Sequence, residues 1–501
     1  MNSVHTVTYW NTWQKGLASV VFALLFVINL PTYTDPDLWG HLRFGLDHIQ
    51  AGGLSWTDPY SYLNEGYPWI NHEWLMETFM GFAWLWGGEI GLTVLRHFVY
   101  SLTVGILFWY IIRQFRAPFV PAVVISLILI ATTLWFARVV RPQIFTFLLF
   151  ACTLIIIDQA ERGHFRWLWL MPLIVIFWVN LHGGFLAGCG VLGVWMLARF
   201  VTSPRQWQHV VPPVVVSAIA TLVNPYGWNL LRFLLETATG DRPEIADWQP
   251  LPLRSEFGII YLSVVTFAVA GLIFSRLPRR PIPIGLFILV SLMPLLAIRH
   301  LPLMGIAFVV FIGEHVVDAW QRLIGERQRE VPVPGWLVPV PFVVAALILL
   351  IGIGRYDWRI APALPVPEQA VQLLRQSDFR GHLLVDFGWG QYVIWHLGPQ
   401  VQVGMDGRRE TVYPPEVYDL YVQFHYGIDD WDAILERATA DAVLVEKGSP
   451  PSNLLQLKEG WQLVFTDDIS MLFINETSAS AQVIARFADS FTPVESNKAF
   501  P

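Results

Sequence analysis

Apolar runs close to 20 residues long recur along the first 355 positions of this chain, and they constrain its fold more than any other feature. A helix needs about 20 apolar residues to cross the hydrocarbon core of a bilayer. The runs predict about eleven transmembrane helices, at residues 16–33, 91–112, 118–137, 143–157, 167–181, 184–200, 209–224, 258–274, 283–298, 301–318 and 334–354. The first run passes directly into Asp35-Pro36-Asp37 without the small-residue cleavage site of a signal peptide, so we expect a retained helix.

The composition agrees with a membrane protein. Charged residues make up 14% of the chain and hydrophobic residues 54%, whereas a soluble domain carries about 25% charged residues. A wholly soluble enzyme is therefore excluded. The formal net charge of -7 argues against nucleic-acid binding, which requires a concentrated basic face. Cys152 and Cys189 both lie inside apolar runs, so neither a disulfide framework nor a cysteine-based zinc site is expected.

Lysine and arginine residues in short loops indicate the orientation of the spans. Short cytoplasmic loops are enriched in these residues. Every second loop carries such a cluster, made up of Lys15, Arg113, Arg116, Arg162, Arg166, Arg199, Arg205, Arg276, Arg279, Arg280, Arg322, Arg327 and Arg329. We therefore expect a multi-pass protein with a cytoplasmic N-terminus, an outer loop at 34–90 and an extracytoplasmic C-terminal segment.

The composition becomes that of a soluble domain from about residue 360. Short strands are predicted at 382–386, 401–406, 442–446 and 463–467, and helical spacing is seen at 366–375, 414–424 and 430–438. Alternating strands and helices indicate a small α/β domain. We expect an all-α transmembrane domain over 1–355, an external α/β domain over 356–475, and a flexible tail over 476–501, which lacks periodicity.

Polar motifs from distant parts of the chain fall on the predicted outer face. Polar residues near membrane depth are costly and usually functional. We therefore take the polar residues of these motifs as candidate substrate-binding residues: His41, Arg43, Asn71, His72, Glu73, Arg138, Arg141, Gln143, His182, Tyr226, Glu244, Asp247, Arg299 and His300.

Three arginines in this set, Arg138, Arg141 and Arg299, lie on the face that normally avoids positive charge. A guanidinium beside lipid needs an anion, and phosphate is its best bidentate match. A lipid phosphate would supply that anion. The alternative is structural pairing with the carboxylates of the outer loop, namely Asp35, Asp37 or Glu73.

Asp35 and Asp37 directly follow the first span and are the candidate catalytic residues. Either carboxylate could act as a general base toward an acceptor hydroxyl, and the two together could bind a divalent cation such as Mg²⁺ or Mn²⁺. Asp37 could instead only cap an amphipathic helix over 38–50.

Two histidines have simpler alternatives. His182 stands beside Gly183-Gly184 and could be a polar plug in a tight interhelical turn. His72 has no second histidine at ligand spacing, so we do not expect a zinc site.

The arrangement resembles the GT-C class of polyprenyl-phosphate-dependent glycosyltransferases. The likeness rests on the acidic Asp35-Pro36-Asp37 after the first span, a long outer loop with expected interfacial helices near 37–50 and 71–86, many spans and an external α/β domain. It is closest to bacterial membrane proteins with Asp-Pro-Asp-Leu-Trp, Asn-His-Glu-Trp, Asn-Leu-His-Gly-Gly and Asn-Pro-Tyr-Gly motifs. The Trp-Trp-Asp signature of oligosaccharyltransferases does not occur in the chain, which argues against en bloc transfer to asparagine.

The resemblance implies a role for each matching position. An acidic residue of the first outer loop, here Asp35 or Asp37, would act as base or metal ligand. Basic residues at the outer ends of later spans, here Arg138, Arg141 and Arg299, would bind the donor phosphate. The implied activity is inverting transfer of a hexose or pentose from a polyprenyl-phosphate donor to a lipid, glycan or protein acceptor outside the bacterial inner membrane.

Two rival functions remain at this point, a transporter or flippase and a non-catalytic assembly protein for envelope polysaccharide. A transporter usually places ionisable residues near mid-membrane and shows repeats, whereas the spans here are almost uncharged in the middle. The polar segments 386–392 and 405–410 of the external domain have either a packing role or an acceptor-binding or lid role.

Overall fold

The computed structural model describes residues 10–64, 66–237, 245–324, 332–437, 439–494 and 499–500. The chain divides into two compact units. The membrane unit comprises Met1–Thr32 and Thr93–Trp358, and the second unit comprises Tyr33–Leu92 and Arg359–Pro501. The outer loop and the C-terminal segment thus belong to one unit, although they are far apart in the sequence.

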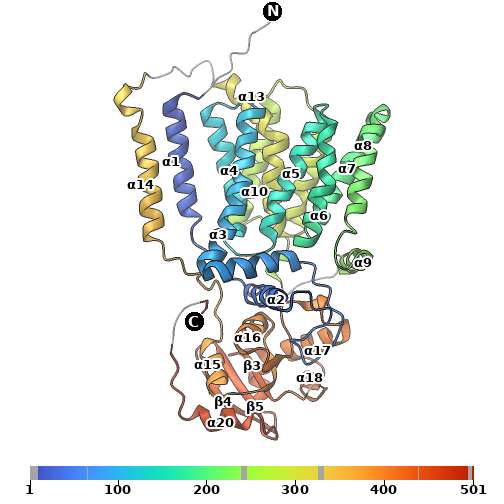
Figure 1. Cartoon of the computed structure of the whole chain (residues 1–501), viewed down its shortest axis with the longest axis vertical. Coiled ribbons are helices and arrows are strands. Elements are labelled where there is room, and N and C mark those ends of the chain that lie inside the picture. The colour runs from blue at the N-terminus through green and yellow to red at the C-terminus, as the bar shows by residue number, and fades with distance from the viewer. Residues whose placement is uncertain are drawn as a thin grey trace, which may run out of the picture. The chain divides into compact units, whose positions relative to one another are not determined.

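The membrane unit is built of helices that lie side by side (Figure 1). Its α-helices are α1 (Thr12–Ile28), α4 (Phe119–Ala137), α5 (Gln143–Glu161), α6 (Met171–Leu181), α7 (Phe185–Thr202), α8 (Trp207–Ala220), α9 (Trp228–Thr237), α10 (Glu256–Phe274), α11 (Pro281–Leu292), α12 (Leu301–Ala307), α13 (Gly313–Leu323) and α14 (Val340–Arg355). Helix α3 (Trp74–Gln114) begins in the second unit and continues into the membrane unit. It is interrupted at Gly87 and Gly88, and Gly88 has a φ of 56° that favours glycine.

Within the described residues, seven helices are long and apolar enough to cross a membrane. Three shorter apolar helices, Thr12–Ile28, Phe165–Leu181 and Pro281–Leu295, accompany them. The membrane nature of the chain is thus confirmed, and the count of eleven spans is not. Several runs that read as one span in the sequence are broken in the structure. The run at 167–181, for example, is a 3-10 helix, Phe165–Leu170, followed by α6.

A buried charge network joins one end of four helices of the membrane unit. Asp158 of α5 is fully buried and receives Arg162 Nε at 2.7 Å and Arg280 Nη2 at 2.7 Å. Glu314 of α13 accepts from Arg162 Nη2 at 2.6 Å. Tyr110 of α3 donates its hydroxyl to Asp158 as well. Arginines that the sequence assigns to cytoplasmic loops therefore also hold helix ends together.

The second unit contains a five-stranded sheet in the order β2-β1-β3-β5-β4. The strands are β1 (Gly381–Val385), β2 (Val401–Val403), β3 (Ala442–Glu446), β4 (Trp461–Thr466) and β5 (Ser470–Asn475). Strands β2, β1 and β3 are parallel, with Gly381 opposite Val401 and Leu383 opposite Ala442. Strands β3, β5 and β4 are antiparallel.

Helices of the second unit lie around this sheet (Figure 1). They are α2 (Leu38–Ala51), α15 (Glu368–Gln376), α16 (Gly390–Leu397), α17 (Pro415–Tyr426), α18 (Ala433–Arg437), α19 (Pro450–Leu455) and α20 (Gln482–Ala488). The four predicted strands and the three predicted helices of the α/β domain are present. The expectation missed β5, and the segment where we expected a flexible tail contains α20.

A buried arginine fastens the loop after α2 to the sheet. Arg408 Nη1 donates to Asp58 Oδ1 at 2.7 Å, and Arg408 Nη2 donates to Asp406 Oδ2 at 2.7 Å. The guanidinium also lies about 5 Å from the rings of Phe44, Tyr60 and Trp69 (5.1, 5.1 and 5.0 Å). Arg408, which belongs to the polar segment 405–410, therefore supplies the cation at the centre of this core.

Candidate functional site

The candidate site of the second unit begins where α2 starts. Leu38, Trp39 and Leu42 are buried, which fixes the apolar side of the helix. The opposite side places Asp37 and His41 one turn apart, on the same face. Asp37 holds the N-cap position, but its side chain makes no capping hydrogen bond. Asp37 is therefore the N-cap residue of α2, as the sequence allowed, but its side chain does not cap the helix. Asp35, two residues earlier, is buried.

Asp37 contacts the α/β part of the same unit. Gln391 Nε2 of α16 donates to Asp37 Oδ1 at 3.2 Å. Two glycines permit this approach: a Cβ at position 407 would lie 2.2 Å from Asp37 Oδ1, and one at position 40 would lie 1.9 Å from Gln391 Oε1. Any side chain at either position would displace the pair.

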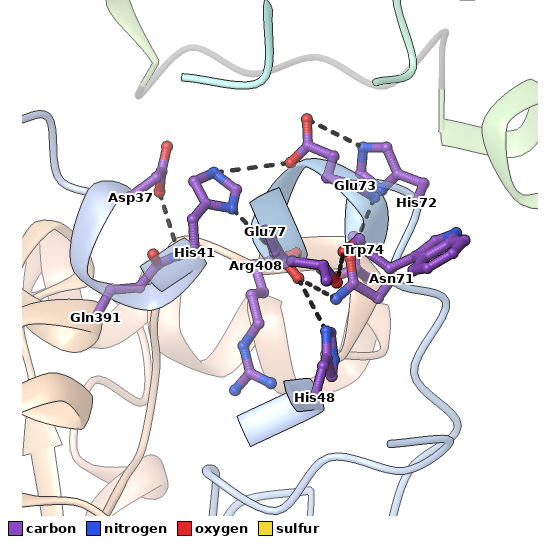
Figure 2. A network of polar contacts seen from close by, with 12 residues as sticks. Asp37, His41, His48, Asn71, His72, Glu73, Trp74, Glu77, Gln391 and Arg408 are labelled. Carbon is purple, nitrogen blue, oxygen red and sulfur yellow. Dashed lines mark hydrogen bonds and ion pairs between the residues drawn. The ribbon is translucent and has the colours of Figure 1, made fainter. Parts of the chain in front are cut away.

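His41 lies at the centre of a carboxylate and imidazole network (Figure 2). Its Nδ1 is 3.0 Å from Glu77 Oε1, and its Nε2 is 3.8 Å from Glu73 Oε2. Asn71 donates its amide to the other oxygen of Glu77. His48, from the last turn of α2, approaches that same oxygen, with Nδ1 at 3.9 Å. Glu77 is thus held from three sides.

Glu73 lies between two imidazoles at the start of α3. One carboxylate oxygen faces His41, and the other lies 3.8 Å from His72 Nε2. The backbone N–H of Glu73 donates to Asn71 Oδ1 at 3.1 Å. Asn71 therefore fixes both the chain just before α3 and the side chain of Glu77. Figure 2 shows Glu73 between His41 and His72.

The protonation of the two α2 histidines differs. Burial alone lowers the pKa of His41, but the hydrogen bond to Glu77 and the charges of Glu73, Glu77 and Asp37 raise it to about 9. Burial lowers the pKa of His48, against a weaker upward effect of Glu77. At neutral pH His41 is thus an imidazolium among carboxylates, and its positive charge balances part of their charge.

The donor set of the described residues limits the kind of metal site that Asp35 and Asp37 could form. In the described part of the chain no group of three or more His, Cys, Asp or Glu side chains could hold a metal ion. Mg²⁺ often uses only one or two carboxylates and completes its shell with water and substrate phosphate oxygens. Asp35 and Asp37 fit only a site of that kind.

The membrane unit has a separate cluster of predicted residues. Arg141, just before α5, donates Nη1 to Asp247 Oδ2 at 2.8 Å. Asp247 belongs to a short 3-10 helix, Ala246–Trp248, whose Trp248 ring lies 4.6 Å from the guanidinium of Arg299. The short helix therefore joins two of the three predicted phosphate-binding arginines. The partner of Arg141 here is Asp247, a residue first assigned to substrate.

Arg138 and an unpredicted arginine, Arg96, meet at the C-terminal end of α1. Arg138 Nη2 donates to Ile28 O at 2.7 Å. Arg96, fully buried on α3, donates to Asn29 O at 2.6 Å, Asn29 Oδ1 at 3.1 Å and Leu30 O at 3.3 Å. It also donates to Ala137 O, at the end of α4. Two guanidiniums are therefore bound by helix C-termini, whose carbonyls carry partial negative charge.

The remaining predicted residues have local partners. His182 Nδ1 lies 2.8 Å from Thr146 Oγ1 and accepts from Gly184 N at 2.9 Å, which is the contact of an interhelical plug. His300 Nδ1 lies 3.3 Å from Met293 O. Arg43 pairs with Asp47 on another face of α2. Gln143 is buried at the start of α5. Tyr226 lies in a turn, where its N–H donates to Asn224 Oδ1. Glu244 lies outside the described residues.

Sequence reasoning missed Glu77, His48 and Arg96. Glu77 follows Glu73 by four residues in a segment predicted to be helical, so helical spacing could have placed both acids on one face. His48 follows His41 by two turns and could have been found in the same way. Arg96 lies inside a predicted span, where a charge signals function or tight pairing.

Comparisons with known proteins address the fold. No family model matches the chain, and no curated protein does so either. The structure of the arabinofuranosyltransferase AftD from Mycobacteria is similar, with a TM-score of 0.53 at 17% identity over 94% of this chain. The chain spans 40% of the length of that protein. Apo ArnT from Cupriavidus metallidurans is also similar, with a TM-score of 0.53 at 12% identity over 93% of this chain and 98% of ArnT.

These likenesses show the fold. The chain has a GT-C-like fold, as the sequence resemblance predicted. Because the identities are below one fifth, they do not carry substrate or mechanism to this chain.

Proposed function

We propose that the chain is a glycosyltransferase that moves a sugar from a polyprenyl-phosphate donor to an acceptor hydroxyl. The observation that carries the proposal is the network of Asp37, His41, Glu73 and Glu77 in a chain with a GT-C-like fold. Glu77 is buried, whereas Asp37 and Glu73 are half-buried, and a half-buried carboxylate within reach of an acceptor hydroxyl can act as a general base. A transporter usually places ionisable residues near mid-membrane, whereas this network belongs to the second unit and not to the membrane unit.

The reaction is an inverting displacement. Asp37 or Asp35 takes the proton of the acceptor hydroxyl as the oxygen attacks the anomeric carbon. The new carbon–oxygen bond forms as the bond from that carbon to the donor phosphate oxygen breaks, and the polyprenyl phosphate leaves with the electron pair. Phosphate is a good leaving group, so the mechanism needs little acid catalysis. The proton remains on the carboxyl group until water removes it.

His41 is a positioning residue in this mechanism. As an imidazolium between Glu73 and Glu77 it keeps the start of α2 in register with the start of α3. Its positive charge also attracts the side chain of Asp37, which lies one turn away. His72 and Glu73 are proposed to orient sugar or acceptor hydroxyls, because both are polar side chains beside His41 at the start of α3.

The arginines of the membrane unit are proposed to bind the donor phosphate. Within the described residues, the hydrogen-bond partners of Arg138 and Arg96 are carbonyl oxygens and one imidazole, and none is a carboxylate. The end of α1 therefore carries net positive charge. Arg141 and Arg299 would add bidentate donors, with Asp247 and Trp248 holding their planes. In the second unit, a Mg²⁺ ion held by Asp35 and Asp37 would supply positive charge beside the proposed base.

The proposed site of action is the outer face of the bacterial inner membrane, with the N-terminus in the cytoplasm. This orientation follows from the loop arginines. It can be tested by labelling single cysteines introduced at exposed positions such as Asp378 and Arg205.

The decisive experiment replaces the proposed base. Asp37→Asn keeps the size and the Gln391 contact but cannot accept a proton, so we expect transfer to fall by about 100-fold or more. The measurement is mass spectrometry of lipid-linked sugars in a deletion strain complemented with each variant, together with blotting of the membrane fraction. Asp378→Asn, whose side chain is 81% exposed, is the matched control. Undiminished transfer by a membrane-inserted Asp37→Asn protein would refute the proposal.

A further inference from the structure

The carboxyl ends of strands β1 and β3 form a second place where the second unit can hold a ligand. The chain runs from β1 to β2 on one side and then returns to β3 on the other, which gives the order β2-β1-β3. Ligands of open α/β sheets bind at the point where the strand order reverses. Asp386 is the first residue after β1, and its N–H donates to Leu444 O of β3 at 3.1 Å. It stands at that reversal point.

Asp386 has an imidazole partner from a different element. His425, in the last turn of α17, places Nδ1 3.6 Å from Asp386 Oδ2. The other oxygen, Oδ1, accepts from Gly388 N at 3.0 Å. Tyr421, one turn earlier on α17, accepts from Phe387 N at 2.6 Å through its hydroxyl oxygen. These contacts hold the loop after β1 against α17. Oδ2 of Asp386 faces the imidazole of His425.

The pair is accessible to a ligand. The side chain of Asp386 is 21% exposed and that of His425 is 37% exposed. Burial raises the pKa of Asp386, while the Gly388 N–H and His425 oppose this effect. The proposed transfer mechanism uses neither residue. A partly buried Asp–His pair at the end of a strand indicates a ligand-binding site.

Aromatic surface adjoins the pair. Tyr426 is 49% exposed, and its ring lies 5.0 Å from that of His425 at 84°. The Tyr421 ring stacks on the His425 ring with the centroids 5.8 Å apart. An exposed ring can cover the C–H face of a sugar, while a carboxylate and an imidazole take its hydroxyls.

The charge of the pair selects among ligand classes. The carboxylate repels a phosphate or another acid. A metal ion is disfavoured because the described residues contain no group of three suitable ligands. A neutral ligand rich in hydroxyl groups satisfies both the acceptor oxygen of Asp386 and the exposed ring of Tyr426.

We propose that Asp386, His425 and Tyr426 form a binding site for a neutral saccharide. Hydroxyl groups of one sugar unit donate to Asp386 and bond to His425, and its apolar face packs on Tyr426. In a glycosyltransferase this saccharide is part of the acceptor glycan. That last assignment rests on the proposed function, whereas the binding itself does not.

Saturation-transfer NMR on the full chain in lipid nanodiscs tests the site. The probes are mannotetraose, cellotetraose and arabinotetraose. We expect at least one to bind, and Asp386→Asn or His425→Ala to weaken it about tenfold or more, as loss of a hydrogen bond to a charged group would. Tyr426→Ala should weaken binding too, and Tyr426→Phe should keep it because the ring remains. His425 and Tyr426 are exposed enough that their variants test the site even if Asp386→Asn does not fold.

Two controls separate this inference from the proposed function. Asp419→Asn, on the exposed surface of α17, should bind the probe like the wild type. Asp37→Asn should also bind it while losing transfer. Saccharide binding without any transfer in the wild type would retain this site and refute the transferase. The inference is overturned if no probe binds, if the Asp386 and His425 variants bind normally, or if Asp37→Asn alone removes binding.

Discussion

Two buried arginines, one in each unit, show two different ways to keep a positive charge inside the protein. Arg408 in the second unit is neutralised by two buried carboxylates, Asp58 and Asp406, and is surrounded by aromatic rings. Arg96 in the membrane unit has no carboxylate partner among the described residues. It is held by carbonyl groups at the ends of α1 and α4 and by His97.

The two arginines differ in the net charge of their surroundings. Around Arg408 two negative charges meet one positive charge, and burial raises the pKa of Asp58 although Arg408 lowers it. Around Arg96 the helix ends supply only partial charges, and Arg138 adds a second guanidinium at the end of α1. A closed ion cluster serves packing, whereas a group of cations without carboxylates is prepared for an external anion.

The largest expected effect is on the closed cluster. Arg408→Met removes the only cation between Asp58 and Asp406 within the described residues and leaves two buried carboxylates, which we expect to cost about 3–5 kcal/mol of stability. The measurement is the unfolding midpoint of the purified protein in detergent. Arg380→Met, in which the replaced side chain is 66% exposed, is the control. An unchanged midpoint would show that Arg408 does not secure the loop.

A smaller effect is expected for the other arginine. Arg96→Met leaves carbonyl groups without a donor but no unpaired ionised partner, so we expect a loss of about 2 kcal/mol. The same variant should weaken the apparent affinity for the polyprenyl-phosphate donor, because it lowers the positive potential near Arg138. Unfolding midpoints and donor titrations test the two parts. A loss as large as that of Arg408→Met would remove the distinction between the two sites.

The smallest effect concerns pH. The pKa of His41 in the folded protein is about 9, above its ordinary value of 6.5, so its stabilising contribution is fully present below pH 6.5 and is lost as pH rises through about 9. Unfolding midpoints between pH 6 and pH 10 should therefore fall by a few degrees for the wild type. Glu77→Gln should flatten this dependence, whereas Glu416→Gln, on the exposed surface of α17, should not. A parallel decline in all three proteins would argue against the His41–Glu77 pair.

Much of the architecture could be predicted from the sequence. Apolar length predicted a membrane protein, and the alternation of strands and helices after residue 360 predicted the α/β domain. Strand β5 was missed because Ser470–Asn475 is a short, continuous apolar run, which periodicity cannot distinguish from other buried segments. The number of spans was not recoverable because prolines and 3-10 turns interrupt runs that look continuous.

The candidate site was predicted in part. His41, Asn71, His72 and Glu73 were selected from one loop, and contacts join them in the structure. Their role in catalysis stays a prediction. Gln391 contacts Asp37 from a position more than 350 residues away in the chain, and no local pattern could have paired them. Arg43 shared the motif of His41 but lies on another face of α2, where it pairs with Asp47.

The sequence by itself determined that this is a membrane protein. Long apolar runs and a low charge content are properties of the sequence alone, and they decide whether a segment is stable in a bilayer. It also identified the polar residues that were candidates for the functional site. Only the tertiary structure decided which charges meet. Ion pairs such as Arg408 with Asp58, or Arg141 with Asp247, depend on how distant segments pack, and their energy falls steeply with distance and exposure.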